Sequence, residues 1–235
     1  MKGYAKGILF AWAVPLAAAE PPDPARAWDA LWRVYLVDAG VIFVVFAALG
    51  AWFMLRYRRR APDEQGSAPE LSRLAAVGWA LVPAFAFMAD DFYLAAKTWQ
   101  AWNVYREVPV ERLEVKLEAA LWRWEFTYPN GVKSTNELRV PAGKPVLLRM
   151  TSLDVVHSYF LPDFRVKEDS MPGRVTYLWF YPRQPGEHLA VCAEFCGMMH
   201  SKMMGKVIVL PPEEFAAWYE GEARRLAAAP PKPEA

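Results

Sequence analysis

Apolar residues are concentrated in two long runs within the first hundred positions of the chain. The first run covers residues 34–55 and contains one charged residue, Asp38, while the second covers residues 74–96 and includes Pro83. A helix that spans the hydrocarbon core needs about 20 mostly apolar residues, and membrane helices tolerate an internal proline. Two buried core helices of this length would need a far larger soluble domain around them. The pattern therefore predicts a transmembrane hairpin over residues 31–98.

The loop between the two runs, residues 56–73, is rich in arginine. Its basic residues are Arg56, Arg58, Arg59, Arg60 and Arg73. Short positive loops remain on the cytoplasmic side of a membrane. We therefore expect two spans in a cell membrane, of the bacterial plasma-membrane type, with both chain termini on the outer, periplasmic or extracellular, side. Asp38, Asp90 and Asp91 then fall near the outer ends of the spans, where they are either solvated or in contact with a partner membrane subunit.

The first 19 residues have the pattern of a secretory signal peptide. Lys2 and Lys6 precede a short apolar stretch, and three alanines at residues 17–19 form an A-x-A cleavage signal. This order of charged, apolar and small residues is typical of signal peptides. Pro15 interrupts the apolar stretch, which leaves an uncleaved interfacial segment as the alternative. Cleavage would place the mature N-terminus outside, in agreement with the charge of the loop.

Beyond residue 109 the pattern changes to short segments that alternate between apolar and polar positions. The segments that read as strands are residues 113–119, 122–128, 145–152, 174–181, 187–192 and 206–210. Regularly spaced short strands are typical of a β-sandwich or a small barrel. We therefore predict an all-β domain over residues 109–211. Glutamates at the start of residues 212–235 and arginines further along suit the dipole of a C-terminal helix, followed by a tail.

The amino-acid composition argues against some functional classes and for others. The 235 residues carry 27 Lys and Arg against 26 Asp and Glu, a net charge of +1. Non-specific nucleic-acid binding depends on a basic face, so nucleic acid is not an expected partner. Eleven tryptophans fit contact with membrane lipid, because tryptophan is enriched at membrane interfaces. Two cysteines are too few for a disulfide-stapled scaffold.

The residues that carry chemistry lie in one short segment, C-A-E-F-C-G-M-M-H-S-K-M. Cys192 and Cys196 are four positions apart, His200 follows four positions later, and Met203 three positions after that. Thiolate, imidazole and thioether groups are soft ligands that favour copper over hard cations. A mononuclear blue-copper site uses one cysteine, whereas two close thiolates can each bridge two metal ions. The segment therefore favours a dinuclear copper centre that takes a second histidine from elsewhere.

The second histidine is either His157 or His188, because the chain has three histidines in all. His188 lies on an alternating strand segment and reads as a surface or strand-packing residue. His157 is the candidate ligand, with a satisfied core histidine as the alternative. For the cysteine pair, a disulfide, a structural zinc site or a reactive thiol pair remain alternatives.

Three segments of the chain resemble one known family. The segment from Cys192 to Met203 closely resembles the C-S-E-x-C-G-x-x-H-x-x-M signature of the CuA domain in subunit II of cytochrome c oxidases. D-V-V-H-S-Y-F-L-P, ending at Pro162, is similar to that family's D-V-x-H-S-x-x-x-P, and F-R-V-K-E-D-S-M-P-G-R resembles the segment that follows it. The resemblance covers residues 31–210. It implies a cupredoxin-like Greek-key β-sandwich behind the two-helix membrane hairpin.

The resemblance also implies a role for each candidate ligand. Cys192 and Cys196 would bridge two copper ions, and His157 and His200 would each cap one of them. Met203 and the backbone carbonyl of Glu194 would be weak ligands of the copper ions. The Glu194 side chain would reach towards a magnesium ion at the border with subunit I. Trp122 would be the aromatic group through which electrons arrive.

These positions imply an oxidoreductase subunit that accepts electrons from cytochrome c or a similar soluble donor. It would pass them to heme in subunit I of a heme-copper oxidase, where oxygen is reduced to water. A membrane-anchored copper carrier is the alternative from another class. A quinol-oxidase subunit II would share the fold without the copper ligands, and a nitrous oxide reductase would need a further large domain.

Three features depart from the family pattern. In the second span Trp79 and Pro83 match the family's E-x-x-W-T-x-x-P, but Ala76 stands at the glutamate position and Ala80 at the threonine position. Proton uptake by that route is in doubt, which leaves open the CuA subunit of a nitric oxide reductase. The β domain lacks an excess of acids for docking a basic cytochrome, so apolar contact with the donor is expected. No C-x-x-C-H occurs in the sequence, so the donor is a separate protein.

Overall fold

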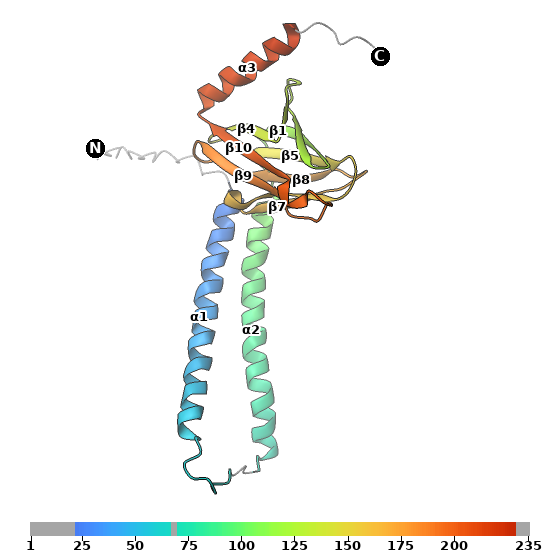
Figure 1. Ribbon diagram of the computed structural model, residues 1–235. Helices are drawn as coiled ribbons and strands as arrows, with labels where there is room; N and C mark the ends of the chain where they lie inside the picture. The colour runs from blue at the N-terminus through green and yellow to red at the C-terminus, as the bar shows by residue number, and fades with distance from the viewer. Residues whose placement is uncertain (1–21, 67–69, 229–235) are drawn as a thin grey trace, which may run out of the picture.

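The computed structural model describes residues 22–66 and 70–228. Two long helices run side by side and lead into a β domain, and a further helix follows at the C-terminal end (Figure 1). The predicted fold class, a helical hairpin followed by an all-β cupredoxin-like sandwich and a short C-terminal helix, is confirmed. The expected signal peptide, residues 1–19, lies outside the described residues.

The hairpin consists of α1 (Pro24–Arg56) and α2 (Arg73–Arg106). Asp23 caps α1 by accepting a hydrogen bond from the backbone N–H of Ala25, and Ser72 caps α2 in the same way through Ala75. Both helices are long and apolar enough to cross a membrane, and the side chains of their apolar windows are not buried within the structure. Each helix also extends beyond its apolar run towards the β domain. The polar residues of these extensions continue the helix because they contact that domain.

Ten strands form the β domain. They are β1 (Leu113–Ala120), β2 (Arg123–Thr127), β3 (Lys133–Thr135), β4 (Glu137–Pro141), β5 (Val146–Ser152), β6 (His157–Leu161), β7 (Val166–Ser170), β8 (Thr176–Phe180), β9 (Gly186–Cys192) and β10 (Met204–Leu210). One sheet has the order β3-β2-β1-β5-β8 and the other the order β4-β10-β9-β6-β7. The pairs β1–β5 and β4–β10 are parallel and the other pairs are antiparallel. This mixed order is that of a Greek-key sandwich rather than a meander.

The core lies between the two sheets and is rich in aromatic residues. Trp124 and Phe126 on β2 are buried and make edge contacts with Tyr159 on β6, with ring centroids 4.8 and 6.0 Å apart. The alternation that predicted the second strand is therefore the alternation between core and surface. The strand begins at Arg123, so Trp122 lies in the preceding turn rather than in the predicted strand.

Four strands, β3, β4, β6 and β7, were not among the strand segments that the sequence indicates. Strand β6 shows the reason most clearly, because four of its five residues are buried and its polar and apolar residues do not alternate. A strand covered on both faces lacks the period-two signal.

The C-terminal helix α3 (Pro212–Ala228) packs its aromatic face on the β domain. Phe215 is buried, and Trp218 and Tyr219 make edge contacts with Tyr128. Glu213 lies in the first turn, where it favours the helix dipole.

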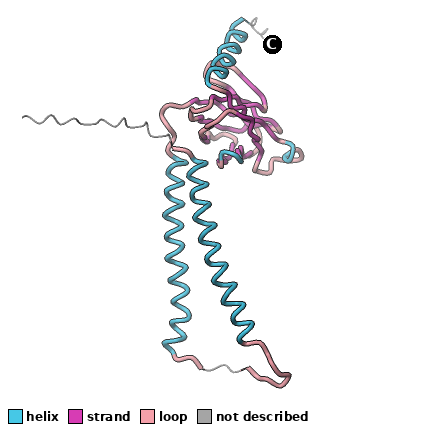
Figure 2. Tube along the Cα trace, turned by 90° about the vertical axis from the view of Figure 1, so that its left-hand side faces the viewer, coloured by secondary structure: helices cyan, strands magenta, loops and turns pink. Residues whose placement is uncertain are grey.

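The hairpin is joined to the β domain by direct side-chain contacts. The buried Asp23 carboxylate accepts a hydrogen bond from Arg183 Nε at 2.7 Å. On the other helix, the backbone carbonyl of Tyr105 accepts one from the indole N–H of Trp179 at 2.7 Å. Figure 2 shows the ends of both helices beside the β domain, and residues 107–112 connect α2 to β1. These contacts fix the domain relative to the helix ends.

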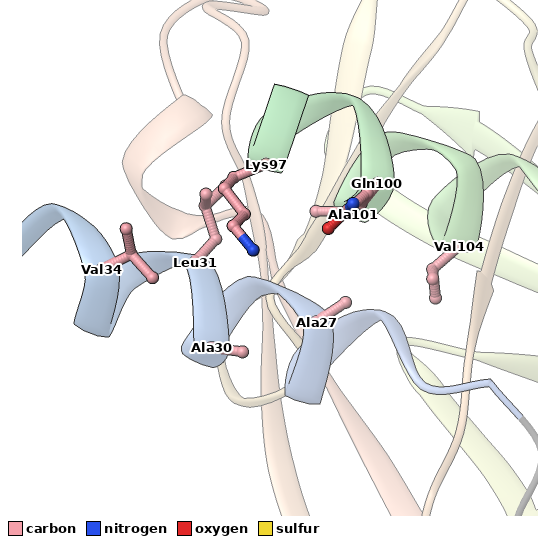
Figure 3. A pocket seen from close by; sticks show the side chains of 8 residues that line it. All are labelled: Ala27, Ala30, Leu31, Val34, Lys97, Gln100, Ala101 and Val104. Atoms are coloured by element: carbon pink, nitrogen blue, oxygen red, sulfur yellow. The ribbon is translucent and has the colours of Figure 1, made fainter. Parts of the chain in front are cut away.

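A groove separates α1 and α2 near the β domain. Figure 3 shows its lining, which consists of Ala27, Ala30, Leu31, Val34, Lys97, Gln100, Ala101 and Val104. Small alanine side chains create this space of about 250 Å³. The groove contains none of the predicted site residues, so the candidate chemistry lies elsewhere.

Candidate metal centre

Two neighbouring strands of one sheet bring the predicted ligands together. His157 is the first residue of β6 and Cys192 is the last residue of β9. The two strands are antiparallel, with Tyr159 opposite Cys192. The loop after β9 carries Cys196 and His200, and it ends at Met203 just before β10. Residues 35 positions apart therefore meet at one end of the sheet.

The side chains form a compact set of soft ligand atoms. The Sγ atoms of Cys192 and Cys196 are 3.8 Å apart, and both cysteines are free thiols. His157 Nδ1 lies 4.0 Å from the Cys192 sulfur, and His200 Nδ1 lies 3.6 Å from the Cys196 sulfur. The Met203 thioether is 3.7 Å from the Cys196 sulfur. Each thiol thus has one imidazole beside it.

The loop backbone is shaped by turns that hold these atoms in place. Gly197 has φ +112°, a left-handed conformation that favours glycine. The N–H of His200 then bonds to the carbonyl of Gly197 at 3.1 Å, and the N–H of Cys192 to the carbonyl of Met203 at 3.1 Å. The second bond ties the end of the loop back to its beginning.

The cluster is closed on one side and open on the other. The exposed fraction is 0% for His157, 1% for Met203, 4% for Cys196 and 9% for Cys192. His200 is only partly buried. Burial and the neighbouring Cys192 thiol raise the pKa of Cys196 to about 11. A metal must therefore displace a proton from this thiol when it binds at neutral pH.

Asp154 orients His157 and was not among the residues predicted from the sequence. Its Oδ1 lies 2.7 Å from His157 Nε2, and its Oδ2 accepts the backbone N–H of Leu121 at 2.7 Å. Burial acts to raise the pKa of the Asp154 carboxyl, but the hydrogen bonds from His157, Leu121 and Val155 outweigh it and hold the pKa below its usual value. A proton on Nε2 leaves the Nδ1 lone pair towards the thiols, the arrangement of a metal-binding histidine. The D-x-x-H spacing was the available sequence signal.

The donor set fits a soft metal. His157, Cys192 and Cys196 offer ligand atoms that all lie within 4.8 Å of one another. His200 and Met203 add an imidazole and a thioether on the side of Cys196. The backbone carbonyl of Glu194 lies 3.2 Å from the Cys192 sulfur. This combination of sulfur and imidazole donors suits copper, and its pair of thiols is what two metal ions would share.

Comparisons with known proteins point to one family. A family model described as cytochrome c oxidase subunit II, periplasmic domain, matches residues 125–210. The alternative cytochrome c oxidase subunit 2 of Bradyrhizobium diazoefficiens is 28% identical over 212 residues, which cover 77% of this chain and 75% of that protein. Cytochrome c oxidase subunit 2 of Thermostichus vulcanus is 41% identical over 106 residues, which cover 45% of this chain and 32% of that protein.

The periplasmic domain of subunit II of the cytochrome oxidase of Bradyrhizobium japonicum is 30% identical, and the match covers 51% of this chain and 99% of that domain with a TM-score of 0.49. These similarities confirm the predicted resemblance to the cytochrome c oxidase subunit II family. The relatives named here are subunits of oxidase enzymes. Together with the two apolar helices, the similarity fits a membrane-anchored protein whose β domain corresponds to the family's periplasmic domain.

Trp122 lies against the loop that carries Cys196 and His200. A Cβ atom added at Gly197 would be 3.6 Å from Cζ2 of Trp122, so the indole ring covers the backbone next to Cys196. Trp122 is partly buried, and its Nε1 has no hydrogen-bond partner within the described residues. The ring thus extends from the protein surface to the cysteine loop.

The other predicted residues take separate positions. The Glu194 side chain is exposed. His188 lies on β9, with Nδ1 2.8 Å from Asp163 Oδ2 and its ring packed on Phe164, in agreement with a strand-packing role. It does not belong to the group of possible metal ligands found among the described residues.

Proposed function

We propose that this protein is the electron-accepting subunit, subunit II, of a heme-copper terminal oxidase. It receives electrons from a cytochrome c-like donor at a dinuclear copper site and passes them to heme in subunit I, where oxygen is reduced to water. The observation that carries the proposal is the pair of free thiols 3.8 Å apart, each with an imidazole beside it. Two thiols so placed are suited to bridging two metal ions.

The residues of the cluster account for a site of this kind. Cys192 and Cys196 would bridge the metals, and His157 and His200 would each cap one. The weaker ligands would be Met203 beside Cys196 and the carbonyl of Glu194 beside Cys192. A thiolate-bridged copper pair supplies a carrier for one electron at a time, shared between two metals.

The protein's own contribution is a fixed and largely dry set of ligands. His157 is held by Asp154, and the turns of the loop fix Cys196 and His200. Ligands that move little between oxidation states need little reorganisation when an electron arrives or leaves. The burial of four of the five side-chain ligands keeps water from the thiols.

Trp122 is the residue through which electrons from the donor would reach the site. Its ring lies on Gly197, the neighbour of Cys196, and it is accessible from outside. Leu153, Val155 and Phe195 are exposed on the adjoining loops, so apolar contact is available to a docking donor. The exposed Glu194 side chain would reach a magnesium ion at the border with subunit I.

The proposed arrangement in the membrane follows from the charge of the loop between α1 and α2. Its arginines favour a cytoplasmic position for this loop, which would put both chain termini and the β domain on the outer side. Membrane lipid then surrounds the exposed apolar faces of the hairpin.

One observation favours a second candidate. Ala76 and Ala80 occupy the positions where the family pattern has glutamate and threonine, so a proton route through that span lacks its carboxylate. A nitric oxide reductase that receives electrons through the same copper site is compatible with this change. Turnover of oxygen and of nitric oxide by the intact complex distinguishes the two.

The test of the copper site is electron paramagnetic resonance on the full chain, loaded with copper in detergent. Two coppers per chain and a seven-line hyperfine pattern, from one unpaired electron shared equally by two copper nuclei, are expected. The His188→Ala variant, which changes a histidine outside the cluster, should give the same spectrum. A four-line mononuclear spectrum with one copper per chain would reject the electron-accepting site and favour a membrane-anchored copper carrier.

A further inference from the structure

We propose that Met198 and Met199 form an exposed thioether site that receives Cu(I) and passes it through His200 to the buried thiol of Cys196. This inference rests on the proposed copper function and concerns how the metal reaches its ligands. The thioethers would act before the final site is filled and are not ligands of the finished centre.

A gradient of exposure leads from solvent to the thiols. The exposed fraction is 91% for Met198 and 44% for Met199, and His200 is partly buried. His200 Nδ1 then lies 3.6 Å from the sulfur of Cys196, which is 4% exposed. On the opposite side of the cluster, His157 and Met203 are almost completely buried. A route from solvent to Cys196 therefore begins at the two methionines.

The backbone directs both methionines outward. A turn closed by the bond from His200 N–H to the Gly197 carbonyl has Met198 and Met199 as its two central residues. The ring of Trp122 lies over Gly197, which covers the loop on that side. The methionines are consequently the soft donors that an arriving ion meets first.

Ligand chemistry gives the direction of transfer. A neutral thioether is a soft ligand that selects Cu(I), and a thiolate is a stronger one. The ion exchanges its bonds to thioether sulfur for a bond to Cys196 sulfur, and the Cys196 proton leaves to water. Copper remains Cu(I) throughout, so the step needs no oxidant or reductant.

The experiment measures copper uptake by the metal-free full chain in detergent, with reduced thiols and without oxygen. Cu(I) is supplied as its coloured bicinchoninate complex, and the loss of colour gives the rate. The variant combines Met198→Leu and Met199→Leu, which keep volume and remove sulfur. We expect uptake to slow by about tenfold, the lower end of what residues around a metal site contribute to affinity. The control is Met204→Leu, an exposed methionine on β10.

The spectrum of the fully loaded chain distinguishes a failure of this inference from a failure of the proposed function. After oxidation by one equivalent of ferricyanide, the slow variant and the unchanged chain should give the same seven-line spectrum. Uptake by the double variant at the unchanged rate would overturn the loading route. A failure of the unchanged chain to give that spectrum would instead overturn the copper function.

A second measurement examines the receiving site without the thiols. In a chain with Cys192→Ser and Cys196→Ser, competition with bicinchoninate should reveal weak binding of one Cu(I). That binding should disappear when Met198→Leu and Met199→Leu are added. Equal Cu(I) binding with and without the two methionines would overturn the proposal.

Discussion

The metal centre has two halves that are built differently. His157 belongs to a strand, is fully buried, and has its second ring nitrogen 2.7 Å from Asp154. His200 opens a short 3-10 helix, η2 (His200–Lys202), in the loop, is partly exposed, and lies beside the exposed ring of Phe195. The half that contains His157, here called the strand half, is fixed by the core of the domain. The half that contains His200, here called the loop half, is fixed mainly by its own turns.

This difference separates two requirements of a metal protein. A ligand on a buried strand keeps its geometry whether or not metal is bound, because its position is set by core packing. A ligand on an accessible loop allows the metal to enter. One rigid half and one accessible half therefore give a preformed site that can still be filled after folding.

The largest contrast is expected between His157→Ala and His200→Ala in the metal-free chain. His157→Ala leaves a cavity and removes the hydrogen bond between His157 and Asp154, and should lower the free energy of unfolding of the β domain by about 2–4 kcal/mol. His200→Ala should change it by no more than about 0.5 kcal/mol, as for a typical surface substitution. Urea unfolding followed by tryptophan fluorescence measures both. Equal losses would show that the two halves are not different in rigidity.

The next effect concerns Asp154. Asp154→Asn keeps the size of the side chain but weakens the hold on the Nε2 proton of His157. Copper affinity should fall by about 10–100-fold, as for other residues that orient a metal-binding histidine. Competition with a copper chelator measures the change. Asp163→Asn, at the partner of His188, is the matched control and should leave copper affinity unaltered.

Gly197→Ala tests the loop half through its backbone. The φ of +112° strains any residue with a side chain, so unfolding of the metal-free domain should become easier by about 1–3 kcal/mol. The added Cβ would be 3.6 Å from the Trp122 ring, an ordinary contact, so the backbone and not crowding is the cause. Gly221→Ala in α3 is the control, and it should stabilise its helix by about 0.5–1 kcal/mol. A neutral Gly197→Ala result in the same urea unfolding series would show that the loop adapts.

The smallest effect is expected for the exposed ion pair between Lys206 and Glu187. Its atoms are 3.1 Å apart, but both side chains are more than half exposed. Lys206→Ala should change the free energy of unfolding by less than about 1 kcal/mol. Thermal unfolding at low and high salt checks this. A larger, salt-sensitive loss would mean that surface charge supports the strands near the site.

Much of the metal centre could be predicted because its ligands lie in local motifs. The spacing of Cys192, Cys196, His200 and Met203 within twelve residues is visible in the sequence and needs no knowledge of the fold. The family pattern supplied His157. Asp154 was missed because its importance depends on contacts with both His157 and the backbone of Leu121, 33 residues away.

The fold was predictable where a strand or helix has one face exposed to solvent. Strand β2 alternates between buried and surface positions and was found, although Trp122 was placed in it rather than in the turn before it. Strand β6 has almost no exposed face and was missed. The helix ends nearest the β domain were also missed. Contacts such as that between Asp29 and Arg165 stabilise polar residues within a helix that hydropathy alone ends too early.

The attachment of both helices to the β domain has a mechanical consequence. Helices of 33 and 34 residues are each about 50 Å long, whereas the hydrocarbon core is about 30 Å thick. The remainder is a stiff stalk, clamped to the domain at Asp23 and Tyr105. A change in bilayer thickness that tilts the stalk would therefore tilt the domain with it, so the lipid sets the height at which the domain stands above the membrane.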